Sequence, residues 1–247
     1  MIFKRINEDI KAFKLRDPAA RSAFDVIFLY QGFHVLMIYR VSHFFWALKM
    51  KFVGRLISQL GRIVTGIEIH PGAVIGRRLV IDHGMGVVIG ETSNIGDDVT
   101  LYHDVTLGGV SPAVNSRQQV GVKRHPTLED GVTVGSGAQI LGPIVIGKNA
   151  RVGSNAVVSK DVPAGLTAVG IPARIVIPKD KEKSKNFSAY GTMPEGQPDP
   201  VLVTIENLRE QVRGLVERVK ELEKNDSPDF GGESNETAVK KLRKLGN

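Results

Sequence analysis

Residues 128–158 read LEDGVTVGSGAQILGPIVIGKNARVGSNAVV, and every sixth residue of this stretch is aliphatic. The same period appears in two runs upstream. Together the runs supply thirteen positions: Ile69, Ile75 and Ile81; Ile89, Ile95, Leu101 and Leu107; Leu128, Val134, Ile140, Ile146, Val152 and Val158. A hexapeptide period is the signature of a parallel β-helix, in which each repeat is one short strand and one turn. The sequence therefore predicts a three-sided β-helix over residues 67–178, with three hexapeptides in each coil.

The composition of residues 67–178 agrees with this prediction. The region holds seventeen Gly, thirty-one Val plus Ile and a single aromatic residue, Tyr102. Glycine suits turns that need positive φ, and the interior of such a prism is too narrow for rings. Two irregularities interrupt the period: eight residues separate Ile81 from Ile89, and a break runs from Leu107 to Leu128. Insertions in a solenoid form loops, and loops carry function.

Residues 1–66 are predicted to form a helical domain, because they hold eleven of the fifteen aromatic residues and show a helical period. The dipeptide Asp17-Pro18 is a typical helix start, with Asp17 as the cap and Pro18 at the first helical position. The apolar stripe is expected at Phe24, Phe28, Val35, Ile38, Ser42, Phe45, Leu48 and Phe52.

Residues 179–200 are charged and turn-rich, which predicts a linker, and residues 201–247 are expected to form a coiled-coil helix and a flexible tail. The seam residues are Val201, Ile205, Leu208, Val212, Leu215, Val219 and Leu222. β-Branched residues at one seam position and Leu at the other favour parallel dimers, whereas a prismatic β-helix usually trimerises. The coiled-coil pattern and the β-helix therefore predict different numbers of chains in the oligomer.

Charge and cysteine content exclude several classes of protein. The 247 residues contain no Cys, so disulfide frameworks and zinc–thiolate sites are excluded, and a cytoplasmic location is expected. The uncharged stretch 26–39 is shorter than the roughly 20 residues of a membrane span, and the start of the chain is too charged for a secretory signal, so we expect the mature chain to be the whole chain. The net charge of +7 comes from residues 1–66, where the basic residues are scattered along the predicted helices. This pattern favours a solvent-exposed helix face over a nucleic-acid-binding surface.

Polar residues gather at the two irregularities, where a structural repeat would place small ones. They are Glu68, His70, Asp82, His83, His103, Arg124 and His125. His70 is equally well explained as a turn residue, and a structural role is favoured for His103. The helical residues His34 and His43 are interpreted as structural.

The chain resembles the serine O-acetyltransferase family, hexapeptide-repeat acyltransferases of cysteine biosynthesis. The resemblance is carried by RDPAARSAF (16–24), YQGFH (30–34), IEIHPGAVIGRRLVIDHGMGVVIGET (67–92), VTLGGV (105–110), KRHPTLEDGVTVGSGAQILG (123–142) and VGSNAVVSKDVPAGLTAVGIPARIV (152–176). It implies a mainly β fold, a left-handed parallel β-helix with an N-terminal α-helical domain. It also implies transfer of the acetyl group of acetyl-CoA to the hydroxyl of L-serine.

The family's site residues are implied at matching positions. His83 would be the general base that takes the proton of the serine hydroxyl, which attacks the thioester without a covalent acyl-enzyme. Glu68, where many members have Asp, would orient His83. Asp17 and Asp82 would hold the serine ammonium group, while Arg124 would pair with its carboxylate and His125 would contact the substrate near the reacting centre.

Coenzyme A would lie along the side of the β-helix between neighbouring subunits, and no metal is expected. The matching residues are Gly109, Val110, Ser136, Gly137 and Ser154, with Arg151 for a phosphate. This chain departs from the family in having Ser136 and Ser154, where Ala is common, and in a longer loop after Val110. The resemblance further implies feedback inhibition by L-cysteine and a homotrimer.

Two other functions stay open at this point. A related β-helix builds γ-type carbonic anhydrases, in which three histidines hold zinc. A non-catalytic assembly role is the other, since family members bind O-acetylserine sulfhydrylase through a C-terminal isoleucine. This sequence ends in Leu245-Gly246-Asn247, so we expect that mode of docking to be absent.

Overall fold

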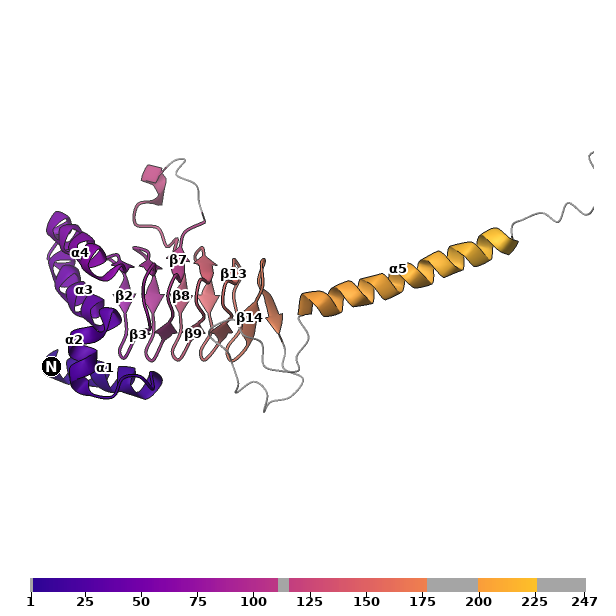
Figure 1. Cartoon of the computed structure of the whole chain (residues 1–247). Coiled ribbons are helices and arrows are strands. Elements are labelled where there is room, and N and C mark those ends of the chain that lie inside the picture. Colours follow the sequence, from indigo (N-terminus) through magenta and orange to yellow (C-terminus); the bar gives the residue numbers. More distant parts are fainter. Residues whose placement is uncertain (1, 111–115, 177–199, 226–247) are drawn as a thin grey trace, which may run out of the picture. The chain divides into compact units, whose positions relative to one another are not determined.

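Short strands contain the aliphatic residues of the six-residue period and wind into a three-sided prism (Figure 1). In chain order they are β1 (Glu68–Ile69), β2 (Val74–Ile75), β3 (Val80–Ile81), β4 (Val88–Ile89), β5 (Asn94–Ile95), β6 (Thr100–Leu101), β7 (Thr106–Gly108), β8 (Thr127–Leu128), β9 (Thr133–Val134), β10 (Gln139–Leu141), β11 (Val145–Ile146), β12 (Arg151–Val152), β13 (Val157–Val158), β14 (Thr167–Val169) and β15 (Arg174–Val176). This computed structural model describes residues 2–110, 116–176 and 200–225. The chain forms two compact units, residues 1–194 and 195–247.

Each coil of the left-handed β-helix contributes one strand to each of three sheets. The first sheet has the order β1-β4-β7-β10-β13, the second β11-β8-β5-β2, and the third β15-β14-β12-β9-β6-β3. All neighbours pair in parallel except β14 and β15, which form an antiparallel pair at the end of the third sheet. The prediction of three hexapeptides per coil is confirmed.

The core of the prism is a set of aliphatic ladders. Ile69 pairs with Ile89, and Ile89 with Leu107, so identical repeat positions stack from coil to coil. Twelve of the thirteen predicted positions are at most 3% exposed, and Ile75 is half-buried. Full burial of such a side chain is worth about 1.5–3 kcal/mol, so these ladders dominate the stability of the β-helix.

Helices cover the N-terminal end of the prism (Figure 1). They are α1 (Ile2–Arg16), α2 (Ala23–Leu29), α3 (Gln31–Ala47) and α4 (Lys51–Thr65). The hydroxyl of Tyr39 donates to the carbonyl of Ala73 and that of Ser58 to the carbonyl of Ile69, both at 2.7 Å. These bonds join α3 and α4 to the first coil.

Gly32 is required where α3 meets β3. A Cβ atom at this position would lie 2.0 Å from the carbonyl oxygen of Ile81, so any larger residue would push the helix away from the strand. Because Ile81 directly precedes Asp82 and His83, this contact fixes the helices against the turn that carries the predicted base.

The prediction that Asp17-Pro18 starts a helix is wrong. Asp17 follows the end of α1, and its carboxylate Oδ1 accepts the amide of Ala19 at 2.8 Å within a turn. The N-cap of α2 is Ser22, which forms a capping box with Asp25. Asp17 is therefore available for a role other than capping a helix.

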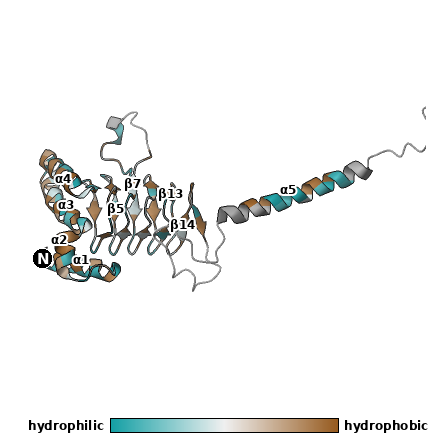
Figure 2. Cartoon of the chain, in the orientation of Figure 1, coloured by the Kyte–Doolittle hydropathy of each residue, from teal (hydrophilic) through white to brown (hydrophobic). Residues whose placement is uncertain are grey.

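The predicted apolar stripe is also only partly correct, because the helix breaks at Tyr30. Val35 and Ser42 are buried, whereas Phe24 and Phe52 are 71% and 80% exposed. Several apolar residues of this region, such as Phe28 and Leu48, are accordingly exposed, and the ribbons of α3 and α4 contain apolar segments, brown in Figure 2. Within the described ranges no single helix is long and apolar enough to cross a membrane; α2 and α3 meet that criterion only as a pair bent by 68°.

The second unit contains α5 (Pro200–Asn225), in which apolar and polar residues alternate around the helix (Figure 2). The predicted coiled-coil segment is thus helical. The linker predicted at 179–200 lies outside the described residues except for Pro200, as does the tail from residue 226 onward.

Candidate active site

The eight-residue spacing between Ile81 and Ile89 corresponds to a turn that contains His83 and Gly84. Both residues have left-handed backbone conformations, with φ values of 59° and 61°. Turns of successive coils stack here: Asp104 N donates to Met85 O at 2.8 Å, and Gly137 N to His103 O at 2.9 Å. We call the column of turns formed by residues 82–87, 102–105, 135–138 and 153–156 the His83 edge. The extra residues in its first turn place His83 on the surface of the prism.

The imidazole of His83 is accessible from outside. Its side chain is 63% exposed, and Nε2 lies 3.9 Å from Oδ1 of Asp82. Asp82 is itself only 13% exposed. The ring of His103 lies one turn along the edge, with its centroid 6.1 Å from that of His83 and nearly perpendicular to it. An exposed imidazole beside a shielded carboxylate is suited to accepting a proton from a bound hydroxyl.

Two carboxylates, Asp17 and Asp82, interact with two phenols, Tyr30 and Tyr102. The hydroxyl of Tyr30 donates to Oδ2 of Asp17 at 2.5 Å. Burial, then the hydrogen bond to Asp17 and the charges of Asp17 and Asp82, raise the pKa of Tyr30 far above its usual value. Burial followed by the charges of Asp82 and Asp17 also raises the pKa of Tyr102. The same two carboxylates therefore raise the pKa of both phenols, and a pair of carboxylates attracts a cation.

Glu68 lies on the first sheet, at the start of β1. Its Oε2 is 3.0 Å from Nη1 of Arg62 and its Oε1 is 3.5 Å from Nη2 of Arg55. Both arginines come from α4, and neither was identified from the sequence. The carboxylate is 20% exposed, so these pairs hold it in place with limited screening. Its orientation of His83 stays a prediction.

Arg124 and His125 lie on a different edge of the prism. They precede β8, next to the turn 90–93 that follows β4. Nδ1 of His125 accepts the amide of Thr92 at 3.1 Å, so in the neutral ring the proton is on Nε2. A Cβ on Gly90 would lie 2.0 Å from Cδ2 of His125, so only glycine fits beneath this ring. We call this column, residues 70–73, 90–93, 109–110, 116–126 and 142–144, the Arg124 edge.

Thr92 organises the Arg124 edge and was missed by sequence reasoning. Its Oγ1 accepts the amides of Arg124 at 3.0 Å and His125 at 3.1 Å, and it lies 2.9 Å from Nδ1 of His125. Burial, followed by the charge of Arg124, lowers the pKa of His125. His125 is 6% exposed, and this burial disfavours the protonated ring. Nη2 of Arg124 reaches Oε2 of Glu91 at 3.5 Å.

His70 lies at the start of the Arg124 edge in a structural setting. Its Nδ1 accepts the amide of Gly72 at 3.0 Å, and its ring packs edge-on against Trp46. Burial, then the charge of Arg55, lowers the pKa of His70 to about 4. His34 and His43 bond backbone oxygens of Ile27 and Pro71, as their structural interpretation predicts.

The residues predicted for coenzyme A are divided between the edges. Ser136, Gly137 and Ser154 lie on the His83 edge, where the Ser136 hydroxyl donates to that of Ser154 at 3.3 Å. Gly109 and Val110 follow β7 on the Arg124 edge. Arg151 lies in β12 of the third sheet. Within the described ranges there is no cluster of three His, Asp or Glu side chains that could hold a metal ion.

The first sheet separates the two edges. The strands β1, β4, β7 and β10 run from the His83 edge to the Arg124 edge, so each coil places one turn at each end of this sheet. Asp82 and His83 are thereby at one end of it, and Arg124 and His125 at the other. One copy of the chain therefore divides the predicted substrate residues between two edges.

Comparison with known proteins finds matches for both the N-terminal helices and the β-helix of the first compact unit. A family model described as "Serine acetyltransferase, N-terminal" matches residues 1–37, and one described as "Bacterial transferase hexapeptide (six repeats)" matches residues 125–160. A serine acetyltransferase of Bacillus licheniformis is 43% identical over 226 residues, which cover 92% of this chain and 99% of the relative.

Solved structures agree with this match. Soybean serine acetyltransferase complexed with serine has a TM-score of 0.65 and 41% identity, covering 70% of this chain and 68% of that one. A serine acetyltransferase in complex with CoA has a TM-score of 0.64 and 38% identity, covering 71% and 69%. Another, in complex with cysteine, has a TM-score of 0.67 and 38% identity, covering 71% and 70%. This chain belongs to the serine acetyltransferase family.

Proposed function

We propose that the chain transfers the acetyl group of acetyl-CoA to the hydroxyl of L-serine with His83 as the general base. The observation that carries this assignment is the exposed His83 imidazole beside the Asp17–Asp82 pair. Family membership favours acetyl transfer over zinc-dependent hydration. It also favours a catalytic role over one in assembly alone.

The charges match a zwitterionic amino acid. Asp17 and Asp82 attract its ammonium group, while the guanidinium of Arg124 pairs with its carboxylate. The hydroxyl is thereby directed toward His83, which takes the proton as the serine oxygen attacks the thioester carbonyl. The tetrahedral adduct collapses with release of the CoA thiolate, and the imidazolium returns a proton to that sulfur. A base of this kind contributes about 10² to 10⁴-fold to the rate.

Acetyl-CoA is assigned to the His83 edge. Ser136, Gly137 and Ser154 lie in successive turns of the column that begins at His83, so an extended pantetheine arm along them would deliver the thioester to the base. The small side chains let the arm approach the backbone. Gly109 and Val110, on the Arg124 edge, would then contact coenzyme A from a neighbouring chain, whereas Arg151, in the strand directly before the turn 153–156, would contact it from the same chain.

The division of the site between two edges supports a cyclic trimer. A single copy cannot place Arg124 and His125 beside His83, because the first sheet lies between them. In a threefold assembly, the His83 edge of one copy meets the Arg124 edge of the next, and every copy contributes to two sites. The need to complete the substrate site supports an oligomer in which neighbouring copies share their sites.

L-cysteine is assigned to the same site as an inhibitor. It has the ammonium and carboxylate groups of serine, so Asp17, Asp82 and Arg124 would hold it in the same way. A related enzyme was solved in complex with cysteine, which supports this assignment. The cytoplasmic location and the absence of C-terminal docking to the sulfhydrylase stay predictions.

The test is thiol release from acetyl-CoA with L-serine, homoserine, sugars and amines as acceptors. We expect L-serine to be preferred, and His83→Ala to reduce kcat by at least about a hundredfold, since the base is lost. The matched control is His34→Ala on α3, because the ring of His34 bonds the backbone oxygen of Ile27 and has no assigned role in the site. Full activity of His83→Ala, or a sugar as the best acceptor, would overturn the assignment.

A further inference from the structure

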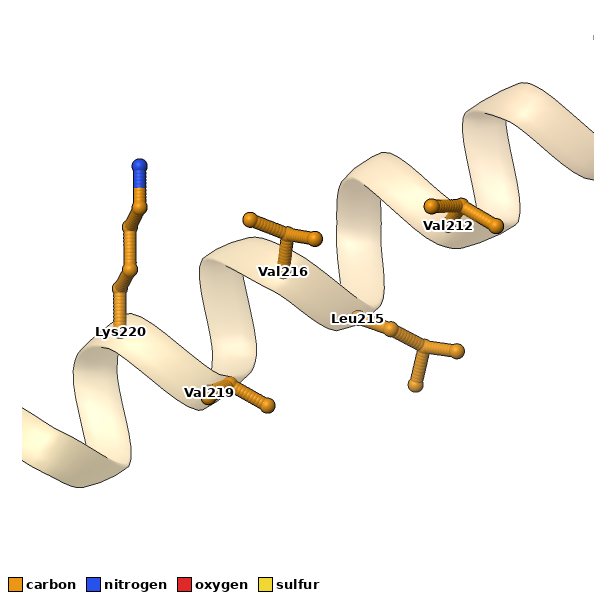
Figure 3. A pocket seen from close by; sticks show the side chains of 5 residues that line it. All are labelled: Val212, Leu215, Val216, Val219 and Lys220. Carbon is orange, nitrogen blue, oxygen red and sulfur yellow. The ribbon is translucent and has the colours of Figure 1, made fainter.

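The helix α5 presents an apolar stripe to solvent. Ile205, Leu208, Val212, Leu215 and Val219 are 40–63% exposed. Figure 3 shows Val212, Leu215 and Val219 of this stripe together with Val216 and Lys220, which with them line a pocket on the helix. The stripe is contiguous over about four turns of helix, whereas scattered apolar residues on a surface need no explanation.

The stripe follows the heptad repeat of a coiled coil. Spacings of three and four alternate, which assigns Ile205, Val212 and Val219 to position a, and Leu208 and Leu215 to position d. A strict period of 3.5 differs from the 3.6 of a straight helix. It keeps the stripe facing a second helix that has the same period.

Packing has to stabilise this helix. In proteins most of the stability of a helix comes from packing of its apolar face, and Gly214 near the centre of α5 costs roughly 1 kcal/mol relative to Ala. A Cβ on Gly214 would meet nothing within 4 Å, so no close approach within the described chain explains this glycine. The apolar stripe is therefore the surface from which α5 gains its stability.

We propose that α5 packs in parallel against α5 of other copies of this chain to form a coiled coil. β-Branched residues at a with Leu at d are the combination that favours two-stranded parallel coiled coils. A stripe of alternating a and d residues packs against a second helix that has the same stripe, so the surface fits a copy of itself.

The assembly proposed for catalysis independently favours the parallel arrangement. In a cyclic oligomer every copy is related by rotation about one axis, so all C-terminal segments have the same polarity along that axis. The coiled coil itself does not depend on the catalytic proposal. Its test uses no activity measurement as the primary readout, so the two proposals can fail separately.

Single cysteines provide the test, because the full-length chain has none of its own. In a parallel coiled coil, equivalent d positions lie within disulfide distance. Leu208→Cys should therefore form a disulfide-linked dimer on mild oxidation, whereas Glu210→Cys, at f on the opposite face, should not. If three helices pack together, one chain in three is left without a partner on a denaturing gel; if two, nearly all chains are linked.

An antiparallel pair would overturn the proposal and has its own signature. It would place residue 208 opposite residue 219, so a disulfide would form only when Leu208→Cys and Val219→Cys are co-expressed. Equal cross-linking of Leu208→Cys and Glu210→Cys would also overturn it. That result would mean that the chains are close together but that the d positions do not face each other in a coiled coil. The same holds if neither variant is cross-linked, in which case another protein covers the stripe.

A second substitution separates the seam from general proximity. Leu215→Asp places a charge in the d layer and should abolish cross-linking of Leu208→Cys, while Leu215→Met should retain it. Amide exchange of α5 should become at least tenfold faster in Leu215→Asp only. Retained cross-linking and unchanged exchange in Leu215→Asp would show that the stripe is not the contact surface.

Discussion

The phenol of Tyr30 and the carboxylate of Asp17 form a 2.5 Å hydrogen bond that joins the start of α3 to the turn after α1. The amide of Ala19 donates to the other carboxylate oxygen at 2.8 Å. Asp17 is thus held at both oxygens. Because the pKa of Tyr30 is raised, its hydroxyl stays a donor over the pH range of an assay. Tyr30 is a positioning residue for the proposed ammonium site.

Replacement of Tyr30 by Phe should weaken serine binding selectively. Loss of one hydrogen bond is worth about 0.5–1.5 kcal/mol, so we expect the KM for serine to rise about two- to tenfold. The KM for acetyl-CoA should stay unchanged. Tyr39→Phe is the matched control, because Tyr39 also donates its hydroxyl, to the carbonyl of Ala73, but at a structural position. Equal changes in both KM values would contradict the positioning role.

The hexapeptide period was sufficient to predict the β-helix, because each aliphatic residue of a solenoid stacks on its equivalent one coil away. All thirteen predicted positions lie in strands, and the two irregularities proved to carry His83 and Arg124. The helices were less predictable. Both Asp17-Pro18 and Ser22 are plausible helix starts locally, and only the structure shows that Ser22 caps α2.

Residues that support the site were not predictable, since their partners are distant in the sequence. Thr92 contacts Arg124 and His125 across more than thirty residues, and its own turn contains no signal for this role. The ion pair of Arg62 with Glu68 likewise depends on how α4 packs on the first coil. The division of the site between two edges follows from the order of the strands around the prism, which the motifs by themselves do not indicate.

Substitution of Thr92 should impair the Arg124 edge. Thr92→Val removes the acceptor for two backbone amides and leaves Nδ1 of His125 without its hydroxyl neighbour. Unpaired polar groups cost about 1–3 kcal/mol each, so we expect kcat/KM for serine to fall at least tenfold. Thr92→Ser keeps the hydroxyl and should restore most of the activity. If Thr92→Ser, which keeps the hydroxyl and loses only the methyl group, is as defective as Thr92→Val, the hydroxyl is not sufficient to support this edge and its proposed role is wrong.

A site shared between copies predicts complementation. His83→Ala and Arg124→Ala should each be nearly inactive, but a co-expressed mixture contains interfaces in which an intact His83 edge meets an intact Arg124 edge. Random mixing in a cyclic oligomer makes about one site in four complete, so about a quarter of the wild-type activity should return. The control is a mixture of the two proteins purified separately and combined without exchange. Co-expression without recovery would place both halves in one chain.

The pH dependence of stability should report the buried His70. Burial and the charge of Arg55 lower its pKa to about 4 in the folded chain, against 6.5 for an unperturbed histidine, while Glu91 and Glu68 act in the opposite direction. Between these values the unfolded chain binds more protons, so the free energy of unfolding falls as the pH is lowered from 6.5 to about 4. Above pH 6.5 the imidazole of His70 is neutral in both the folded and the unfolded chain. It therefore adds no pH dependence to the free energy of unfolding in that range.

Replacement of His70 by Asn should reduce this dependence, because the Asn side chain can accept the amide of Gly72 and does not titrate. Denaturant unfolding at pH 7.5 and pH 5 is the measurement, and the difference between the two free energies should be smaller in His70→Asn than in the wild type. The comparison at pH 7.5 alone gives the cost of the substitution itself. Some slope should persist, since burial also lowers the pKa of His125. An unchanged difference would mean that His70 is protonated in the folded chain at pH 5, despite its burial against Trp46.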